Sequence, residues 1–275
     1  MFPLKDNIPL ARFPIVTALI VAINIVVYLL EIRHGGSFFG GPSERTSVRF
    51  GAIPYELTHA GKHCELVTQQ TFEGTASGVA CLGQPGVTGT PAAQPATALT
   101  ALTSMFLHGS FLHIFGNMLF LVIFGPNVED AIGRLRYLVF YLLAGLLALA
   151  AQVAIDTGST APTLGASGAI AGVLGGYIVL YPRARVLTLV FIVFFVTIIE
   201  VPAFAVLGFW FLEQLWFGAA GLASPLGGEG VAYFAHIGGF LFGLLTIRAW
   251  AAGRTPGPGA PSSRGSRRRI PVFGR

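Results

Sequence analysis

The chain has 275 residues, of which 53% are hydrophobic and only 11% are charged. A water-soluble domain carries about 25% charged residues, so this composition excludes an ordinary soluble protein and predicts an integral membrane protein. The formal net charge is +5, but the basic residues lie between and after apolar segments, as the positive-inside rule describes. The expected partner is therefore the lipid bilayer, and no nucleic acid is expected.

Six apolar segments approach the roughly 20 residues that a bilayer-spanning helix needs. The sequence thus predicts an all-α polytopic membrane protein. The expected spans are Pro14–Leu30, Phe111–Asp130, Leu135–Ala154, Leu164–Tyr181, Val201–Phe217 and Tyr233–Trp250. The apolar, β-branched stretch from Val186 to Ile199 is ambiguous. We favour an interfacial hairpin here, because merging the stretch with the fifth span gives a helix too long for one crossing.

The pattern divides the chain into three parts. Residues 1–13 form an N-terminal lead, and residues 14–252 form a membrane domain with a long polar loop at residues 33–98. Residues 253–275 are rich in Gly, Pro, Ser and Arg, so a disordered basic tail is expected. The basic residues that flank the spans predict that both termini are cytoplasmic and the long loop lies outside. A bacterial cell (inner) membrane is the expected location.

A serine and a histidine stand near the heads of two apolar segments. Ser167 lies in the run Gly165-Ala166-Ser167-Gly168, and His236 lies near the start of the last span. With six spans, both residues begin at a similar depth on the outer side. Serine becomes a nucleophile when a base takes its proton, and histidine is the usual base. The alternative is a serine bonded to its own helix and a histidine that caps a helix, but the matched depth favours a catalytic pair.

Small residues that allow close helix packing recur around both positions: Gly165, Gly168, Gly172, Gly176, Gly239 and Gly243. Most of them are spaced four residues apart, and such faces let membrane helices approach closely. Close approach would bring Ser167 within reach of His236. The same pattern is also typical of ordinary helix packing.

His113 and Asn117 are four residues apart and so share one face of the second span. Polar side chains in a span are costly unless they face the bundle interior. Acyl transfer needs donors aimed at the developing oxyanion, and these two side chains with the backbone N–H of Ser167 are the natural set. The alternative is hydrogen bonding between helices for structure alone. No cofactor and no metal are expected at this site, because no third ligand is obvious at membrane depth.

The long loop holds the two cysteines of the chain, Cys64 and Cys81. On the outer side of a membrane they could form a disulfide. They could instead bind zinc together with His59 and His63, or remain free thiols. The disulfide is the favoured interpretation.

These motifs together resemble the rhomboid family of intramembrane serine proteases. The resemblance covers about Phe13 to Trp250 and rests on four groups of residues: His108 with His113 to Asn117, Gly125 to Glu129 with Gly133 to Tyr137, Gly165 to Gly168, and Ala235 to Gly243. Their order, spacing and placement on helices all agree with the family.

The resemblance implies a six-helix bundle that cleaves transmembrane helices of other proteins near their outer ends. It implies that Ser167 attacks and that His236 is general base and then acid. His113 and Asn117 would help to bind the oxyanion, and Glu129 would be structural.

The family also implies that the fifth helix and the loop Ala219 to Ala232 act as gate and cap. Two features depart from some family members. The Trp-Arg pair of the first loop is absent, and Ala171 stands where a tyrosine would stack on the base.

Two other functions are compatible with the scaffold. A non-catalytic binding or quality-control protein of the membrane, built on the same scaffold, is disfavoured by the intact Ser167 and His236. A small transporter would be expected to carry mid-membrane charges and broken helices in paired halves.

Overall fold

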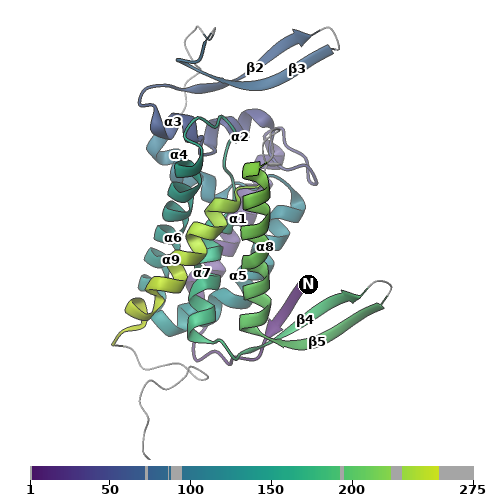
Figure 1. Ribbon diagram of the computed structural model, residues 1–275, viewed down its shortest axis with the longest axis vertical. Coiled ribbons are helices and arrows are strands. Elements are labelled where there is room, and N and C mark those ends of the chain that lie inside the picture. Colours follow the sequence, from purple (N-terminus) through teal and green to yellow (C-terminus); the bar gives the residue numbers. More distant parts are fainter. Residues whose placement is uncertain are drawn as a thin grey trace, which may run out of the picture.

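The computed structural model describes residues 2–71, 74–85, 87, 95–192, 195–223 and 231–253. Within these ranges, five helices are long and apolar enough to cross a membrane: α1 (Ile15–Arg33), α5 (Phe111–Ile132), α6 (Arg134–Ile155), α8 (Ala203–Ala223) and α9 (Tyr233–Ala251). They form a bundle with a shorter apolar helix, α7 (Ser167–Leu180), which contacts α5, α6, α8 and α9 (Figure 1). The predicted helical membrane bundle is confirmed.

The prediction of six full-length spans needs a correction at α7. The fourth segment was expected at Leu164–Tyr181, but the helix begins at Ser167 and has 14 residues. At 1.5 Å per residue it is roughly 21 Å long, shorter than the hydrocarbon core of about 30 Å. The helix does not need to match the thickness of the bilayer, because every residue from Gly168 to Tyr177 is buried inside the protein. Its apolar character therefore reflects burial among helices rather than contact with lipid.

Helices α7 and α9 pack backbone against backbone. A Cβ added at Gly239 would collide with the carbonyl oxygen of Gly168, and one at Gly243 would collide with that of Gly172. Gly168 also faces the Cβ of Ala148 on α6. These glycines allow the direct contact between α7 and α9, and through it the meeting of the residues at the heads of the two helices.

A three-stranded antiparallel sheet lies at one end of the bundle (Figure 1). Its order is β1 (Phe2–Asp6), β4 (Arg185–Ile192) and β5 (Phe195–Pro202). The ambiguous stretch from Val186 to Ile199 is therefore a hairpin and not an extension of the next helix. That the hairpin lies in the membrane interface stays a prediction.

The N-terminal lead is more ordered than its sequence suggests. The sequence of residues 1–13 indicates only a polar lead, but Asp6 accepts hydrogen bonds from Tyr177 Oη (2.6 Å) and Asn127 Nδ2 (2.5 Å). Burial raises the pKa of Asp6 above its ordinary value. Partners on α5 and α7 fix this segment, and they are distant in sequence. The predicted tail at residues 253–275 lies outside the described residues from 254 onward.

Glu129 joins α5 to the start of α1. Its carboxylate accepts the backbone N–H of Val16 (3.0 Å) and both the N–H and the hydroxyl of Thr17 (2.7 Å each). The first N–H groups of a helix have no partner within the helix, and negative charge is favourable there. The Glu129 side chain thus caps α1 from within the bundle.

Replacement of Glu129 by alanine is expected to lower the free energy of unfolding by about 2–4 kcal/mol, because buried N–H groups lose their acceptor. The control is Asp130→Ala, since Asp130 accepts a single exposed bond from Ala11 N and should change stability by less than about 1 kcal/mol. Unfolding of the purified variants in detergent measures both. Equal losses at the two positions would contradict the capping role.

The long first loop contains more structure than predicted. Its elements, with those that lead into α5, are α2 (Glu44–Phe50), α3 (Pro54–Thr58), β2 (Cys64–Thr71), β3 (Gly74–Cys81), α4 (Thr97–Thr103) and the 3-10 helix η1 (Ser104–Phe106). Figure 1 shows the β2–β3 hairpin at the end of the bundle opposite to β4 and β5.

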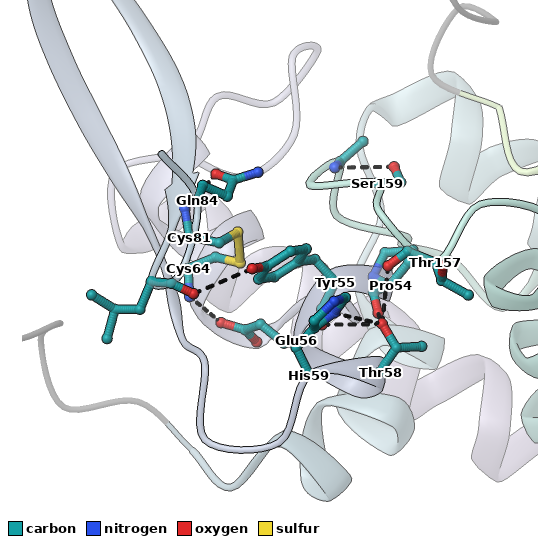
Figure 2. The surroundings of a disulfide bond; sticks show 12 residues. Pro54, Tyr55, Glu56, Thr58, His59, Cys64, Cys81, Gln84, Thr157 and Ser159 are labelled. Carbon is teal, nitrogen blue, oxygen red and sulfur yellow. Dashed lines mark hydrogen bonds between the residues drawn. A yellow bond between two sulfur atoms is a disulfide. The ribbon is translucent and has the colours of Figure 1, made fainter. Parts of the chain in front are cut away.

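Cys64 and Cys81 form a disulfide that closes the β2–β3 hairpin at its base (Figure 2). Both residues are buried and pack with Val48, Ile53 and Tyr55. Because the cysteines are bonded to one another, neither is available to ligate zinc. The described parts of the chain contain no group of three or more His, Cys, Asp or Glu side chains that could hold a metal ion.

The disulfide region is attached to the bundle through α3. The backbone N–H of Tyr55 donates to the carbonyl of Ser159 (3.0 Å). The hydroxyl of Thr58 donates to the carbonyl of Thr157 (2.9 Å) (Figure 2). Both acceptors lie in the connection between α6 and α7. The first loop therefore packs on the segment that leads to Ser167.

Aromatic residues anchor the start of the first loop, where the Trp-Arg pair of some relatives is absent. The ring of Phe38 stacks on Phe111 at 4.9 Å between centroids, and Phe39 contacts the same ring edge-on at 6.0 Å. The Tyr28 hydroxyl of α1 donates to the Phe38 carbonyl (2.6 Å). This cluster holds the loop against the start of α5.

Candidate active site

Ser167 and His236 meet at the heads of α7 and α9. Ser167 is the first residue of α7 and follows Gly165, whose φ of +122° is one that L side chains rarely adopt. His236 lies in the first turn of α9. Ser167 Oγ is 2.7 Å from His236 Nε2, across 69 positions of sequence. This is the distance expected between a nucleophile and its general base.

The imidazole of His236 is also held from α8. Its Nδ1 lies 2.7 Å from Oε1 of the buried Gln214, and the Trp210 ring lies 5.7 Å from it between centroids. The Tyr233 ring approaches edge-on at 6.5 Å. These contacts come from positions other than Ala171, where some relatives carry a supporting aromatic residue.

Sequence reasoning missed Gln214. A signal was present, because an amide within an apolar span is costly unless it faces the bundle interior. The same cost holds for Gln214 on the fifth span as for Asn117 on the second. The partner of the amide could not be named without the packing of α8 on α9.

His113 Nε2 lies beside Gly165, two residues before the serine. The backbone N–H of Gly109 donates to His113 Nδ1 (3.3 Å), so the ring proton of the neutral imidazole is on Nε2. A Cβ built on Gly165 would lie 2.8 Å from His113 Nε2 and 3.6 Å from Ser167 Oγ. A side chain at residue 165 would therefore collide with the His113 ring, and glycine lets that ring pack against the backbone shortly before Ser167. The sequence assigned Gly165 to helix packing, but it lies in the connection before α7 and faces His113.

Asn117 lies one turn further along α5 and is 9% exposed. Its Nδ2 is buried and has no hydrogen-bond partner among the residues that the structure describes. A buried donor of this kind is costly unless it is used. The amide is thus available to an oxygen atom of a bound molecule.

His108 packs edge-on against the His113 ring. It is fully buried, its ring lies 5.2 Å from that of His113, and its Nδ1 donates to the carbonyl of Phe106 (3.2 Å). Burial, with a smaller contribution from His113, lowers the pKa of His108 to about 3. The contribution of His108 to the site is this edge-on packing against His113.

The cap expected at Ala219 to Ala232 lies largely outside the described residues, which stop at 223 and resume at 231. The neighbouring helix α8 is described, and its large apolar side chains, such as Leu212 and Trp216, are exposed. It therefore lies at the edge of the bundle.

Comparison with known proteins agrees with this architecture. Residues 95–252 match the rhomboid domain family. The chain is 34% identical to the mitochondrial rhomboid protein 1 of Saccharomyces cerevisiae over 153 residues, which are 54% of this chain and 40% of that protein. It is 30% identical to the mitochondrial presenilin-associated rhomboid-like protein of Homo sapiens over 148 residues, 53% of this chain and 36% of the relative. It thus spans less than half the length of these relatives.

The expected location is wrong. The expectation is a bacterial cell (inner) membrane, but these curated relatives are named as mitochondrial proteins. Apolar spans and flanking basic residues describe how a chain sits in a bilayer and do not distinguish one bilayer from another.

The rhomboid match covers more than half of the chain and includes α5 to α9 together with Ser167 and His236. On this match and on the helical membrane bundle that carries it, the chain belongs to the rhomboid family.

Proposed function

We propose that this protein is an intramembrane serine endopeptidase whose activity resides in residues 14–252. The observation that carries the proposal is the 2.7 Å contact between Ser167 Oγ and His236 Nε2. A serine and a histidine in contact at partly buried helix heads are the minimal pair for covalent acyl transfer. Packed helices can orient the imidazole without an aspartate.

In the proposed reaction, His236 Nε2 takes the hydroxyl proton as Ser167 Oγ bonds to the carbonyl carbon of the scissile peptide. The imidazolium then gives this proton to the leaving amine, and the C–N bond breaks. The acyl group remains on Ser167 as an ester. Water, deprotonated by His236, attacks the ester and releases the carboxyl product with the free hydroxyl.

The oxyanion of the tetrahedral intermediate would be bound by three donors. His113 offers Nε2–H close to Gly165. Asn117 offers its buried Nδ2, and Ser167 offers its backbone N–H at the start of α7. Fixed donors at the developing charge are worth about 10²- to 10³-fold each in rate.

The proposed substrates are transmembrane segments of other membrane proteins. A segment would enter laterally from the bilayer and unwind locally, because an intact helix hides its carbonyl groups in hydrogen bonds. Cleavage is expected near small residues with helix-breaking residues nearby.

The test is cleavage of a single-span reporter by the purified protein in proteoliposomes, with products mapped by mass spectrometry. Wild type is expected to cut within or near the span, and Ser167→Ala is expected to leave the reporter intact. Equal cleavage by the variant would assign the activity to a contaminant. No cleavage of several reporters by folded wild type would overturn the proposal.

Asn117→Ala is expected to lower kcat by about 10²- to 10³-fold through loss of one oxyanion donor. The fold should survive, because Nδ2 makes no hydrogen bond within the described protein. The matched control is Asn24→Ala, which removes a buried amide of α1 that bonds only to its own helix. Wild-type turnover by folded Asn117→Ala would exclude the oxyanion role.

A further inference from the structure

Gln214 places an amide between α8 and the histidine of the site. Its Oε1 is 2.7 Å from His236 Nδ1, and its Nε2 donates to the carbonyl of Trp210, one turn earlier in α8, at 3.2 Å. Gln214 is 8% exposed, although α8 lies at the edge of the bundle. Both ends of the amide therefore have a partner in a buried position.

Trp210, Gln214, His236 and Ser167 form a chain of hydrogen bonds. The donor and acceptor in each bond follow from the carbonyl of Trp210, which can only accept. The amide nitrogen of Gln214 must face that carbonyl, which leaves the amide oxygen facing His236. An amide oxygen is also only an acceptor, so Nδ1 of His236 carries the ring proton. The lone pair of the neutral ring is then on Nε2, the atom 2.7 Å from Ser167 Oγ.

We propose that Gln214 is a positioning residue that holds His236 in the tautomer and ring orientation needed to accept the proton of Ser167. This inference rests on the proposed function. A neutral imidazole can carry its proton on either nitrogen, and the bond made by one nitrogen decides the state of the other. With the proton on Nε2, the ring cannot deprotonate the serine.

The location of Gln214 makes the base depend on the position of α8. The Trp210 ring, which also contacts His236, belongs to the same helix. The opposite face of α8 is exposed, with Trp216 at 74%. An outward shift of about 1 Å would stretch the Gln214–His236 bond beyond the normal hydrogen-bond range. His236 is thus fully oriented only while α8 packs against α9.

Three variants test this assignment in the reporter assay, with kcat, KM and unfolding midpoint measured for each. Gln214→Met keeps a side chain of similar length but removes the acceptor. Gln214→Glu keeps an acceptor and, when protonated, also a donor for Trp210. Leu212→Met is the matched control on the exposed face of the same helix.

Gln214→Met is expected to lower kcat by about 10- to 100-fold, part of the 10²- to 10⁴-fold that a general base supplies, with KM within about twofold of wild type. Gln214→Glu should recover to within about fivefold of wild-type kcat. The Leu212→Met control should match wild type. A merely structural role would lower the unfolding midpoint of Gln214→Met and leave kcat of the folded fraction unchanged.

Wild-type kcat in folded Gln214→Met would overturn the proposal, as would a folded Gln214→Glu as slow as Gln214→Met. If Gln214→Met fails to fold, Gln214→Asn replaces it, because it keeps the amide but withdraws the acceptor by one methylene. Wild-type kcat in Gln214→Asn is then the overturning result. An inactive, folded wild type would overturn the proposed function together with this inference, whereas active wild type with an unaffected variant overturns the inference alone.

Discussion

Removal of either member of the Ser167–His236 pair is expected to lower the rate of reporter cleavage by about 10⁴-fold or more. The double variant Ser167→Ala/His236→Ala is expected to be no slower than the slower single variant. The reason is that His236 Nε2 acts in catalysis by taking the proton of Ser167 Oγ, which lies 2.7 Å away. Once the serine is removed, loss of the histidine therefore costs nothing further. Groups that act as one unit give strongly non-additive losses.

The measurement compares kcat/KM for wild type, both single variants and the double variant under one set of lipid conditions. Unfolding midpoints of all four proteins serve as the control for folding. Additive losses would contradict the pair, because they would mean that the two side chains assist cleavage independently. A His236→Ala variant that retains most of its activity would do the same.

Gly239→Ala is expected to lower cleavage by about 100-fold and the free energy of unfolding by about 1–3 kcal/mol. A Cβ at this position collides with the carbonyl oxygen of Gly168. Gly239 is one turn from His236, and Gly168 follows Ser167 directly. Separation of the two backbones therefore moves the base away from the nucleophile.

Gly116→Ala provides the matched control for this substitution. Gly116 lies on α5, and a Cβ added there meets nothing within 4 Å. Alanine is also the better helix former by about 1 kcal/mol, so stability should be equal or higher. Wild-type activity and stability in Gly239→Ala would contradict the close approach of α7 and α9.

The main helices could be predicted because their signals are local. Apolar segments of about 20 residues located α1, α5, α6, α8 and α9, and the small-residue spacing on α7 and α9 indicated where backbones could approach. The proximity of Ser167 and His236 could be predicted because the number of membrane spans between them places both residues at a similar depth in the bilayer. Their catalytic roles stay predictions.

The remaining features depend on long-range packing. Hydropathy cannot distinguish a lipid-facing helix from one buried among other helices, so the short length of α7 was missed. The strand pairing of β1 with β4 depends on partners 180 or more residues apart. Gln214 gave a polar signal, but only the packing of α8 on α9 identifies His236 as its partner.

The most direct test of the account is covalent capture of the nucleophile. Wild type and His236→Ala would be treated with a fluorophosphonate in detergent, digested and analysed by mass spectrometry. The account predicts a phosphonyl adduct on Ser167 of wild type and at least about a hundredfold slower labelling in His236→Ala. Folded wild type without an adduct on Ser167, or equal labelling rates in the two proteins, would contradict activation of this serine by this histidine.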